Sequence, residues 1–485
     1  MAEITEKMQV PDAVDWRQRV AELKKDSGAA AVAWAEAALR AGRTVSAQQA
    51  LESVPEKDRN TARYHAAAGA TAISTGQLAN AERHFTEAVK LEPSNEVHRY
   101  NLATFQIQSP DDAKRKTGTE TLETLGGGGR VELYARRSRV TQLRGEKKEE
   151  EALRVSGELL QLPNVEFADR LKHLELLYQL KRPEWQAFAE DLRKQSLHAT
   201  GEDVAALATW TRENIGAAEA LTMLTSLPPD SANHPRVSAT LAETLVALKQ
   251  WPELKAFVSE GNWDSLDYLR LAYMARAFRE MGDPGAAHTR WTAAIGAARK
   301  REPLSQLAWT AARWGWTPEL REVLWAAANT PAPQWALQML HRSYLSEKDT
   351  AGVLRVAQKA LEADAQSASA QNNVAALSLL LRRDQDRARE TARQLHEKMP
   401  ENPYFASTYA LGLHLAGRSA EGLEILKKYK REQLREPSLA AYYGVLLAVT
   451  GAKAEAQEFL ELGEEAPLLP EELALLTAAR EAVTR

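Results

Sequence analysis

Residues 62–95 read ARYHAAAGATAISTGQLANAERHFTEAVKLEPSN, and this stretch decides the fold. Its apolar and alanine positions recur three and four residues apart, the spacing of a helix that is buried on one face. Gly76 interrupts the pattern, because a residue without a Cβ permits a sharp turn. Pro93 ends it, because proline cannot donate the next helical hydrogen bond. The stretch therefore predicts two helices joined by a tight turn, with Phe85 filling the gap between their small residues.

The glycine of this turn recurs along the chain. Glycines between two apolar segments are separated by 34 residues, or by a multiple of 34 to within one residue, at Gly42, Gly76, Gly145, Gly282, Gly417 and Gly451. A fixed period of this length is the signature of a repeat array, in which each repeat contributes one pair of helices.

The pattern resembles the tetratricopeptide repeat, which has a small residue at position 8, glycine at 15, alanine at 20, an aromatic residue at 24, alanine at 27 and proline at 32. Residues 62–95 match all six positions and residues 268–301 match five. The resemblance implies an all-α fold, a right-handed superhelical α-solenoid of about thirteen stacked helix hairpins. The clearest repeats are 62–95, 268–301, 368–402, 403–436 and 437–466.

The remaining sequence extends the same organisation. We expect an N-terminal tail over residues 1–15, a continuous solenoid over 16–485, and a C-terminal capping helix over 471–485. The glycine run at 126–129 is either a loop between repeats or a hinge between two stacks. Degenerate hairpins are expected at 95–125, 130–161, 165–195, 202–227, 235–259, 303–328 and 332–363.

Composition excludes several classes of protein. The chain has 485 residues, no cysteine, and 62 basic against 66 acidic residues. Disulfides and cysteine-ligated metals are therefore excluded, and the near-neutral charge argues against nucleic acid as a partner. The longest apolar run, 439–449, is too short to cross a bilayer. The chain as it stands is expected to be cytoplasmic, whereas one that had lost an N-terminal signal or anchor would be periplasmic or membrane-anchored.

No motif indicates catalysis. The sequence lacks a phosphate-binding loop, a dinucleotide-binding glycine motif, a nucleophile elbow and a zinc-protease helix. Its ten histidines include none with a second histidine two to four residues further on. We therefore expect no catalytic residue, no cofactor and no metal, and a protein that is not an enzyme.

The first helices of the repeats supply the candidate binding residues. In proteins that resemble these repeats, positions 2, 5, 6, 9 and 12 of the first helix face ligand in the concave groove. Arginine recurs at these positions and binds carboxylates through a bidentate fork, which favours an acidic or extended peptide segment of a partner protein. The other interpretation is that the arginines bridge neighbouring repeats. The candidate groove residues are Arg136, Arg139, Gln142, Tyr273, Arg276, Arg279, Gln338, Arg342, Asn372, Asn373, Tyr404 and His414.

A tryptophan-rich stretch offers an alternative patch. Its indole rings either fill the seam of two degenerate hairpins or form an exposed surface for a partner, since tryptophan is favoured at binding hot spots. The residues are Trp309, Trp314, Trp316, Trp325 and Trp335.

These features together predict a non-catalytic scaffold that binds a partner segment in its concave groove. Two other functions fit the same sequence. One is a structural subunit that builds a larger assembly through its end repeats or its tryptophan-rich surface, with self-association as one form. The other is a regulatory or substrate-presenting subunit of an enzyme encoded elsewhere.

Overall fold

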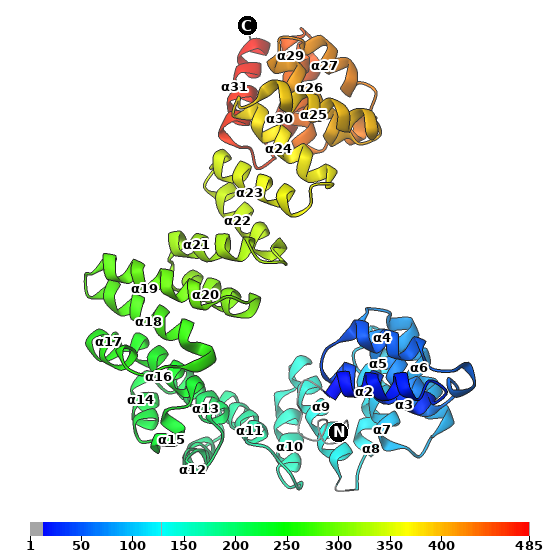
Figure 1. Cartoon of the computed structure of the whole chain (residues 1–485), viewed down its shortest axis with the longest axis vertical. Helices are drawn as coiled ribbons and strands as arrows, with labels where there is room; N and C mark the ends of the chain where they lie inside the picture. Colours follow the sequence, from blue (N-terminus) through cyan, green and yellow to red (C-terminus); the bar gives the residue numbers. More distant parts are fainter. Residues whose placement is uncertain (1–12, 128, 485) are drawn as a thin grey trace. The chain divides into compact units, whose positions relative to one another are not determined.

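The computed structural model describes residues 13–127 and 129–484. These residues form α-helices α2 to α31 and two short 3-10 helices, and no strand. Contacts divide the chain into two compact units, Met1–Ala232 and Asn233–Arg485, called the first and the second unit below. Each unit is a succession of antiparallel helix pairs, which confirms the predicted all-α hairpin solenoid (Figure 1).

The described residues of the first unit form six helix pairs. Before them, α2 (Ala13–Leu23) packs against α3, and after them comes the single turn α15 (Pro229–Ala232). The 3-10 helix η1 (Glu56–Asp58) lies between the first two pairs. The pairs are α3 (Gly28–Arg40) with α4 (Thr44–Glu52), α5 (Ala62–Ser74) with α6 (Leu78–Leu91), α7 (Glu96–Gln106) with α8 (Asp112–Thr124), α9 (Arg130–Gly145) with α10 (Glu149–Leu159), α11 (Phe167–Gln179) with α12 (Trp185–Ser196), and α13 (Gly201–Asn214) with α14 (Ala217–Thr225).

Residues 233–484 of the second unit form seven helix pairs. The short elements are η2 (Asp264–Leu266) and α28 (Arg431–Leu434), and α31 (Pro470–Thr484) follows the last pair. The pairs are α16 (Pro235–Ala247) with α17 (Trp251–Ser259), α18 (Asp267–Glu280) with α19 (Pro284–Ala297), α20 (Arg301–Trp314) with α21 (Thr317–Ala328), α22 (Gln334–Ser346) with α23 (Thr350–Ala363), α24 (Ala368–Leu380) with α25 (Gln385–Lys398), α26 (Pro403–Leu415) with α27 (Ser419–Leu426), and α29 (Pro437–Val449) with α30 (Lys453–Gly463).

The pair α5–α6 shows how the sequence builds a hairpin. The Thr61 hydroxyl accepts the Tyr64 amide hydrogen at 3.2 Å and caps α5. Gly76 adopts a φ of 74°, in the left-handed region, and turns the chain into α6. Phe85 of α6 is buried against α5, where a Cβ at Gly69 would lie 2.7 Å from its ring. The small residue therefore makes room for the aromatic ring, as the repeat pattern predicts.

Several turns lack the expected glycine. Gly145 is the last residue of α9, and the left-handed residue of that turn is Lys147, with a φ of 59°. A basic residue occupies the equivalent place between two helices of a pair four more times, at Lys181, Lys249, Lys348 and Arg382. These five hairpins thus keep the turn geometry without the residue that favours it.

The expected ends and linkers lie as follows. Of the expected N-terminal tail, residues 1–12 fall outside the described residues, and residues 13–15 begin α2. The glycine run at 126–129, whose Gly128 is also outside the described residues, joins α8 to α9 within the first unit. The division between the units follows Ala232, so it does not coincide with that run.

Candidate functional site

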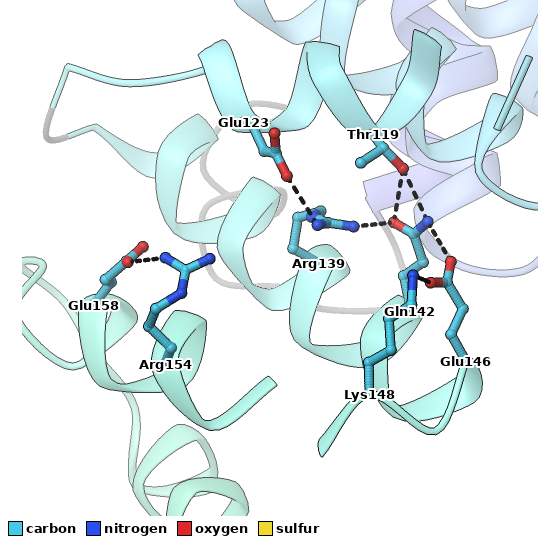
Figure 2. Close-up of polar contacts among 8 residues, drawn as sticks. All are labelled: Thr119, Glu123, Arg139, Gln142, Glu146, Lys148, Arg154 and Glu158. Carbon is cyan, nitrogen blue, oxygen red and sulfur yellow. Dashed lines mark hydrogen bonds and ion pairs between the residues drawn. The ribbon is translucent and has the colours of Figure 1, made fainter. Parts of the chain in front are cut away.

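The first unit pairs its predicted groove arginines internally. Arg139 of α9 is only 6% exposed, and its guanidinium donates to Glu123 of α8 at 2.8 Å and to Gln142 at 3.0 Å. Figure 2 shows Gln142 between Thr119 and Glu146, to both of which its amide donates, at 2.9 and 2.8 Å. These bonds join α8 to α9, so Arg139 bridges neighbouring repeats.

Other charges of this network are also compensated. A hydrogen bond from Lys148 lowers the pKa of Glu146, and Lys148 Nζ lies 2.7 Å from Glu146 Oε2. Arg154 pairs with Glu158 on α10 at 2.6 Å (Figure 2). Arg136 lies 3.7 Å from Glu132, one turn earlier on α9. The first unit therefore offers no uncompensated arginine at Arg136 or Arg139.

The second unit neutralises two further candidates on α18. Arg276 pairs with Glu280 at 2.9 Å, and Arg279 pairs with Glu319 of α21 at 2.6 Å. Tyr273 was expected to face a ligand, but it is 2% exposed and its hydroxyl donates to Glu243 at 3.0 Å. It is therefore part of the core, because its ring packs against other aromatic side chains rather than facing solvent.

The tryptophans do not form one exposed patch. Trp316 is 4% exposed, and Trp314 packs against it with ring centroids 5.0 Å apart. Trp325 and Trp335 are half-buried, and the Trp325 indole donates to the Tyr344 hydroxyl at 3.1 Å. Trp309 alone of the five is exposed, at 61%, with the Arg313 guanidinium 4.6 Å from its ring centroid. Four of the five tryptophans are therefore buried or half-buried between helices.

Three of the predicted groove residues line one cavity of the second unit. Gln338 and Arg342 lie one turn apart on α22, and Asn373 lies on α24. The cavity has a volume of about 590 Å³. Aliphatic side chains of α22, α23 and α24 form most of its wall, among them Leu337, Leu345, Val353, Val356 and Leu377.

Arg342 differs from the other four candidate arginines. It is exposed, and within residues 13–127 and 129–484 no carboxylate forms an ion pair with it. An arginine at the edge of an apolar cavity supplies five donors in a planar fork that matches a carboxylate. The cavity can therefore hold an apolar side chain beside an anionic group.

The end of the chain completes the cavity. Pro467, Leu469 and Glu472 line it, together with Tyr442 of α29. The Tyr442 hydroxyl donates to the Glu472 carboxylate. Burial, and then the Glu472 charge, hold the pKa of Tyr442 well above its usual range, so the hydroxyl remains a donor. No pattern in the sequence marks this contact, because it depends on α31 returning to α29.

The remaining candidates lie outside the cavity. Asn372 is buried, and its side-chain oxygen has no hydrogen-bond partner among the described residues. Tyr404 is exposed on α26. The His414 ring is 2.9 Å from the Ser419 hydroxyl, and burial lowers the pKa of His414.

The sequence also missed a pair of histidines across the α5–α6 hairpin. The Nδ1 atoms of His65 and His84 lie 2.9 Å apart, although the residues are 19 positions apart. Burial, followed by the charge of Arg83, lowers the pKa of His84 to about 4. Over the described ranges, no three histidine, aspartate or glutamate side chains gather as metal ligands. None of the helices in those ranges is both long and apolar enough to span a membrane.

Fold and sequence pattern together define an all-α helical-hairpin repeat protein of the tetratricopeptide-like kind. No protein-family model matches the chain, and no curated protein matches it significantly. Similar solved structures include the Naa15/Naa10 complex bound to HypK-THB, with 16% identity, 98% of this chain and 69% of that chain covered, and a TM-score of 0.23.

Two further structures are similar at the same level. One is a tetratricopeptide repeat protein from Parabacteroides merdae, with 17% identity, 51% of this chain and 93% of that chain covered, and a TM-score of 0.28. The other is the APC/C hetero-tetramer Cut9-Hcn1, with 13% identity, 92% and 95% covered, and a TM-score of 0.26. Likeness this distant does not extend to function, which therefore has to be argued from the site.

Proposed function

We propose that the chain is a non-catalytic scaffold that binds an extended segment of a partner protein at the cavity of the second unit. The observation that carries this proposal is Arg342, an exposed cation without a carboxylate partner among the described residues, on the edge of an apolar cavity. The other four candidate arginines are already paired within the chain.

The lining of the cavity defines the chemistry of the segment. An apolar side chain enters between α22 and α24, where Leu337 and Leu377 exclude water. A neighbouring acidic side chain pairs with Arg342. The side-chain amides of Gln338 and Asn373 supply donors and acceptors to the backbone of the segment. The partner segment is therefore apolar and acidic, which narrows the acidic or extended peptide expected from the sequence.

A displayed library of extended peptides tests the proposal on the full chain. We expect selection of peptides that combine a large apolar residue with nearby acidic residues, and an association rate that falls as salt rises. Arg342→Gln should weaken the selected peptides about tenfold, the effect of losing one charge-assisted pair. Arg383→Gln, the same change at an exposed arginine outside the cavity lining, is the matched control and should leave binding unchanged.

Two results contradict the proposal. Equal loss of binding in both arginine variants means that overall charge, rather than the cavity, attracts the peptides. Binding that Trp309→Ala abolishes and Arg342→Gln does not affect moves the site to the exposed indole of α20. The second result favours the alternative in which the protein joins a larger assembly through its tryptophan-rich region.

A further inference from the structure

The first turn of α31 contacts two separate helix pairs of the second unit. The Thr350 hydroxyl, at the start of α23, donates to the Glu471 carboxylate, 121 residues further along the chain. The Tyr442 hydroxyl of α29 donates to Glu472. Two neighbouring carboxylates therefore attach the first turn of α31 to two different helix pairs, and the Tyr442–Glu472 contact belongs to the cavity lining.

Apolar contacts hold the same segment. Leu469 is buried and lines the cavity beside Pro467, and Leu468 packs against the core of the last helix pairs. The Leu469 amide donates to Glu472 at 2.8 Å, which fixes the first turn of the helix. The segment 466–472, called the C-terminal segment below, thus presents two leucines followed, after one proline, by two glutamates.

This is the chemistry that the cavity selects in the proposed partner. Glu472 is the one carboxylate in the cavity lining of the described residues, and Arg342 is a cation of the same lining. The C-terminal segment fills only part of the space, because about 590 Å³ remains beside it. Leu469, Glu472 and Tyr442 line the same cavity as Gln338 and Arg342 of α22, so a partner segment that fills this cavity meets the C-terminal segment.

A simple end cap accounts for the body of α31 but not for its first turn. Leu476 and Ala479 are buried against the core of the last pairs, as a capping helix requires. The first turn also contacts α23, which belongs to the pair α22–α23, three pairs before the last. Its two carboxylates accept hydrogen bonds from hydroxyls on α23 and α29. A cap for the final pair contacts α29, as Glu472 does, but does not need the contact of Glu471 with Thr350 on α23.

We infer that the C-terminal segment is a built-in competitor for the partner site, and that an apolar and acidic segment of a partner displaces it. In the displacement, the partner's apolar side chain replaces Leu469, and one of its carboxylates replaces Glu472 on the Tyr442 hydroxyl while another pairs with Arg342. The competition rests on the proposed function, whereas the opening of the segment is a property of this chain alone.

The absence of cysteine from the sequence makes the opening measurable. Val353→Cys places a single thiol in the cavity wall, three residues after Thr350. Its labelling rate with a neutral maleimide reports how often the segment opens. Val445→Cys, a buried valine of α29 outside the cavity lining, reports unfolding of the whole unit.

Two substitutions release the segment while keeping side-chain size. Thr350→Val and Tyr442→Phe each remove one hydroxyl donor to a carboxylate. Each should accelerate labelling of the Val353→Cys thiol about tenfold, the effect expected for one hydrogen bond to a charged group, and leave the Val445→Cys thiol unchanged. Thr477→Val and Tyr429→Phe are matched controls, because their hydroxyls bond elsewhere, to Leu473 and Pro400, and neither should change either rate.

The selected peptide then separates the two proposals. Release should strengthen peptide binding several-fold, and saturating peptide should accelerate hydrogen exchange in residues 470–484. Peptide affinity that release leaves unchanged overturns the competition and leaves the proposed function standing. Acceleration of both thiols to the same extent also overturns it, because the segment then only stabilises the fold. Failure of every library peptide to bind the wild type and the release variants overturns both proposals.

Discussion

Arg139 and Arg342 occupy the same kind of position, on the first helix of a pair, in different units and with opposite surroundings. Arg139 is buried, and Glu123 of the preceding helix neutralises it. Arg342 is exposed at the edge of a cavity, with no carboxylate paired to it in the part of the chain that the structure describes. The repeat position alone therefore does not make a binding residue; the side chains that neighbouring helices place opposite it decide.

The largest expected effect is the difference in stability loss between Arg139→Ala and Arg342→Ala. Arg139→Ala deletes two hydrogen bonds of a buried guanidinium and its packing, so we expect the first unit to lose about 2–4 kcal/mol of unfolding free energy. Arg342→Ala should change the stability of the second unit by less than about 0.5 kcal/mol, because exposed side chains contribute little. Urea unfolding of both variants measures the difference; equal losses would mean that Arg342 also supports the fold.

The contrast between these arginines separates the contacts that one sequence can predict from those that it cannot. Glycines and prolines mark the turns and ends of the clearest helix pairs, because turn geometry and helix ends are local properties, whereas five other turns place lysine or arginine in the left-handed region. Glu132 and Glu280 are one turn from the arginines they pair with, and such neighbours can be read from the chain. Glu123 and Glu319 lie 16 and 40 residues from theirs, on other helices, so only packing reveals them.

The cavity was less predictable still. The helix-position rule selected Gln338, Arg342 and Asn373, which line one cavity because residues of successive first helices face the same side. The same rule also selected Tyr273, which is buried. A rule based on helix position does not account for the aromatic rings that pack around this residue. The wall formed by Leu469 and Glu472 depends on a contact over 121 residues, for which one sequence contains no signal.

A second prediction gives Arg342 a carboxylate partner, as Arg139 has in Glu123. Asn373→Glu adds a carboxylate to the same cavity lining, where it can pair with Arg342. We expect the selected acidic peptides to bind about tenfold more weakly, because the cation is now compensated, while stability stays within about 0.5 kcal/mol. Titration calorimetry measures the loss, and Asn373→Gln, which keeps the amide, controls for side-chain length. Equal loss in both variants would indicate steric exclusion instead.

The first unit should also lose stability in mild acid through His84. The pKa of His84 is about 4 in the folded first unit, below the usual value of 6.5. Between these values the unfolded chain binds a proton that the folded chain does not, so stability falls as pH decreases from 6.5 towards 4. We expect a loss of roughly 1 kcal/mol, well below the full shift, because the ring is partly exposed to solvent.

Hydrogen exchange of α5 and α6 between pH 7 and pH 4.5 checks this loss in the first unit. His84→Gln should flatten the pH dependence, whereas His198→Gln, at an exposed histidine of the same unit, should not. Arginine does not titrate in this range, so Arg342 contributes no such dependence to the second unit. An unchanged slope in His84→Gln would show that another group controls the acid response.

The smallest effect tests whether the two regions differ in backbone as well as in charge. The turn after Arg139 and the turn after Arg342 both place lysine in the left-handed region, Lys147 with a φ of 59° and Lys348 with a φ of 55°. Glycine reaches that region without strain, although it has more freedom to lose on folding. Lys147→Gly and Lys348→Gly should therefore each stabilise their own unit by about 0.5–1 kcal/mol.

The control is Gly417→Ala, at a φ of 80°, which should destabilise the second unit by a similar amount. Matching gains in the two units would assign the difference between Arg139 and Arg342 to their side-chain partners; a gain in one unit alone would mean that turn strain differs too.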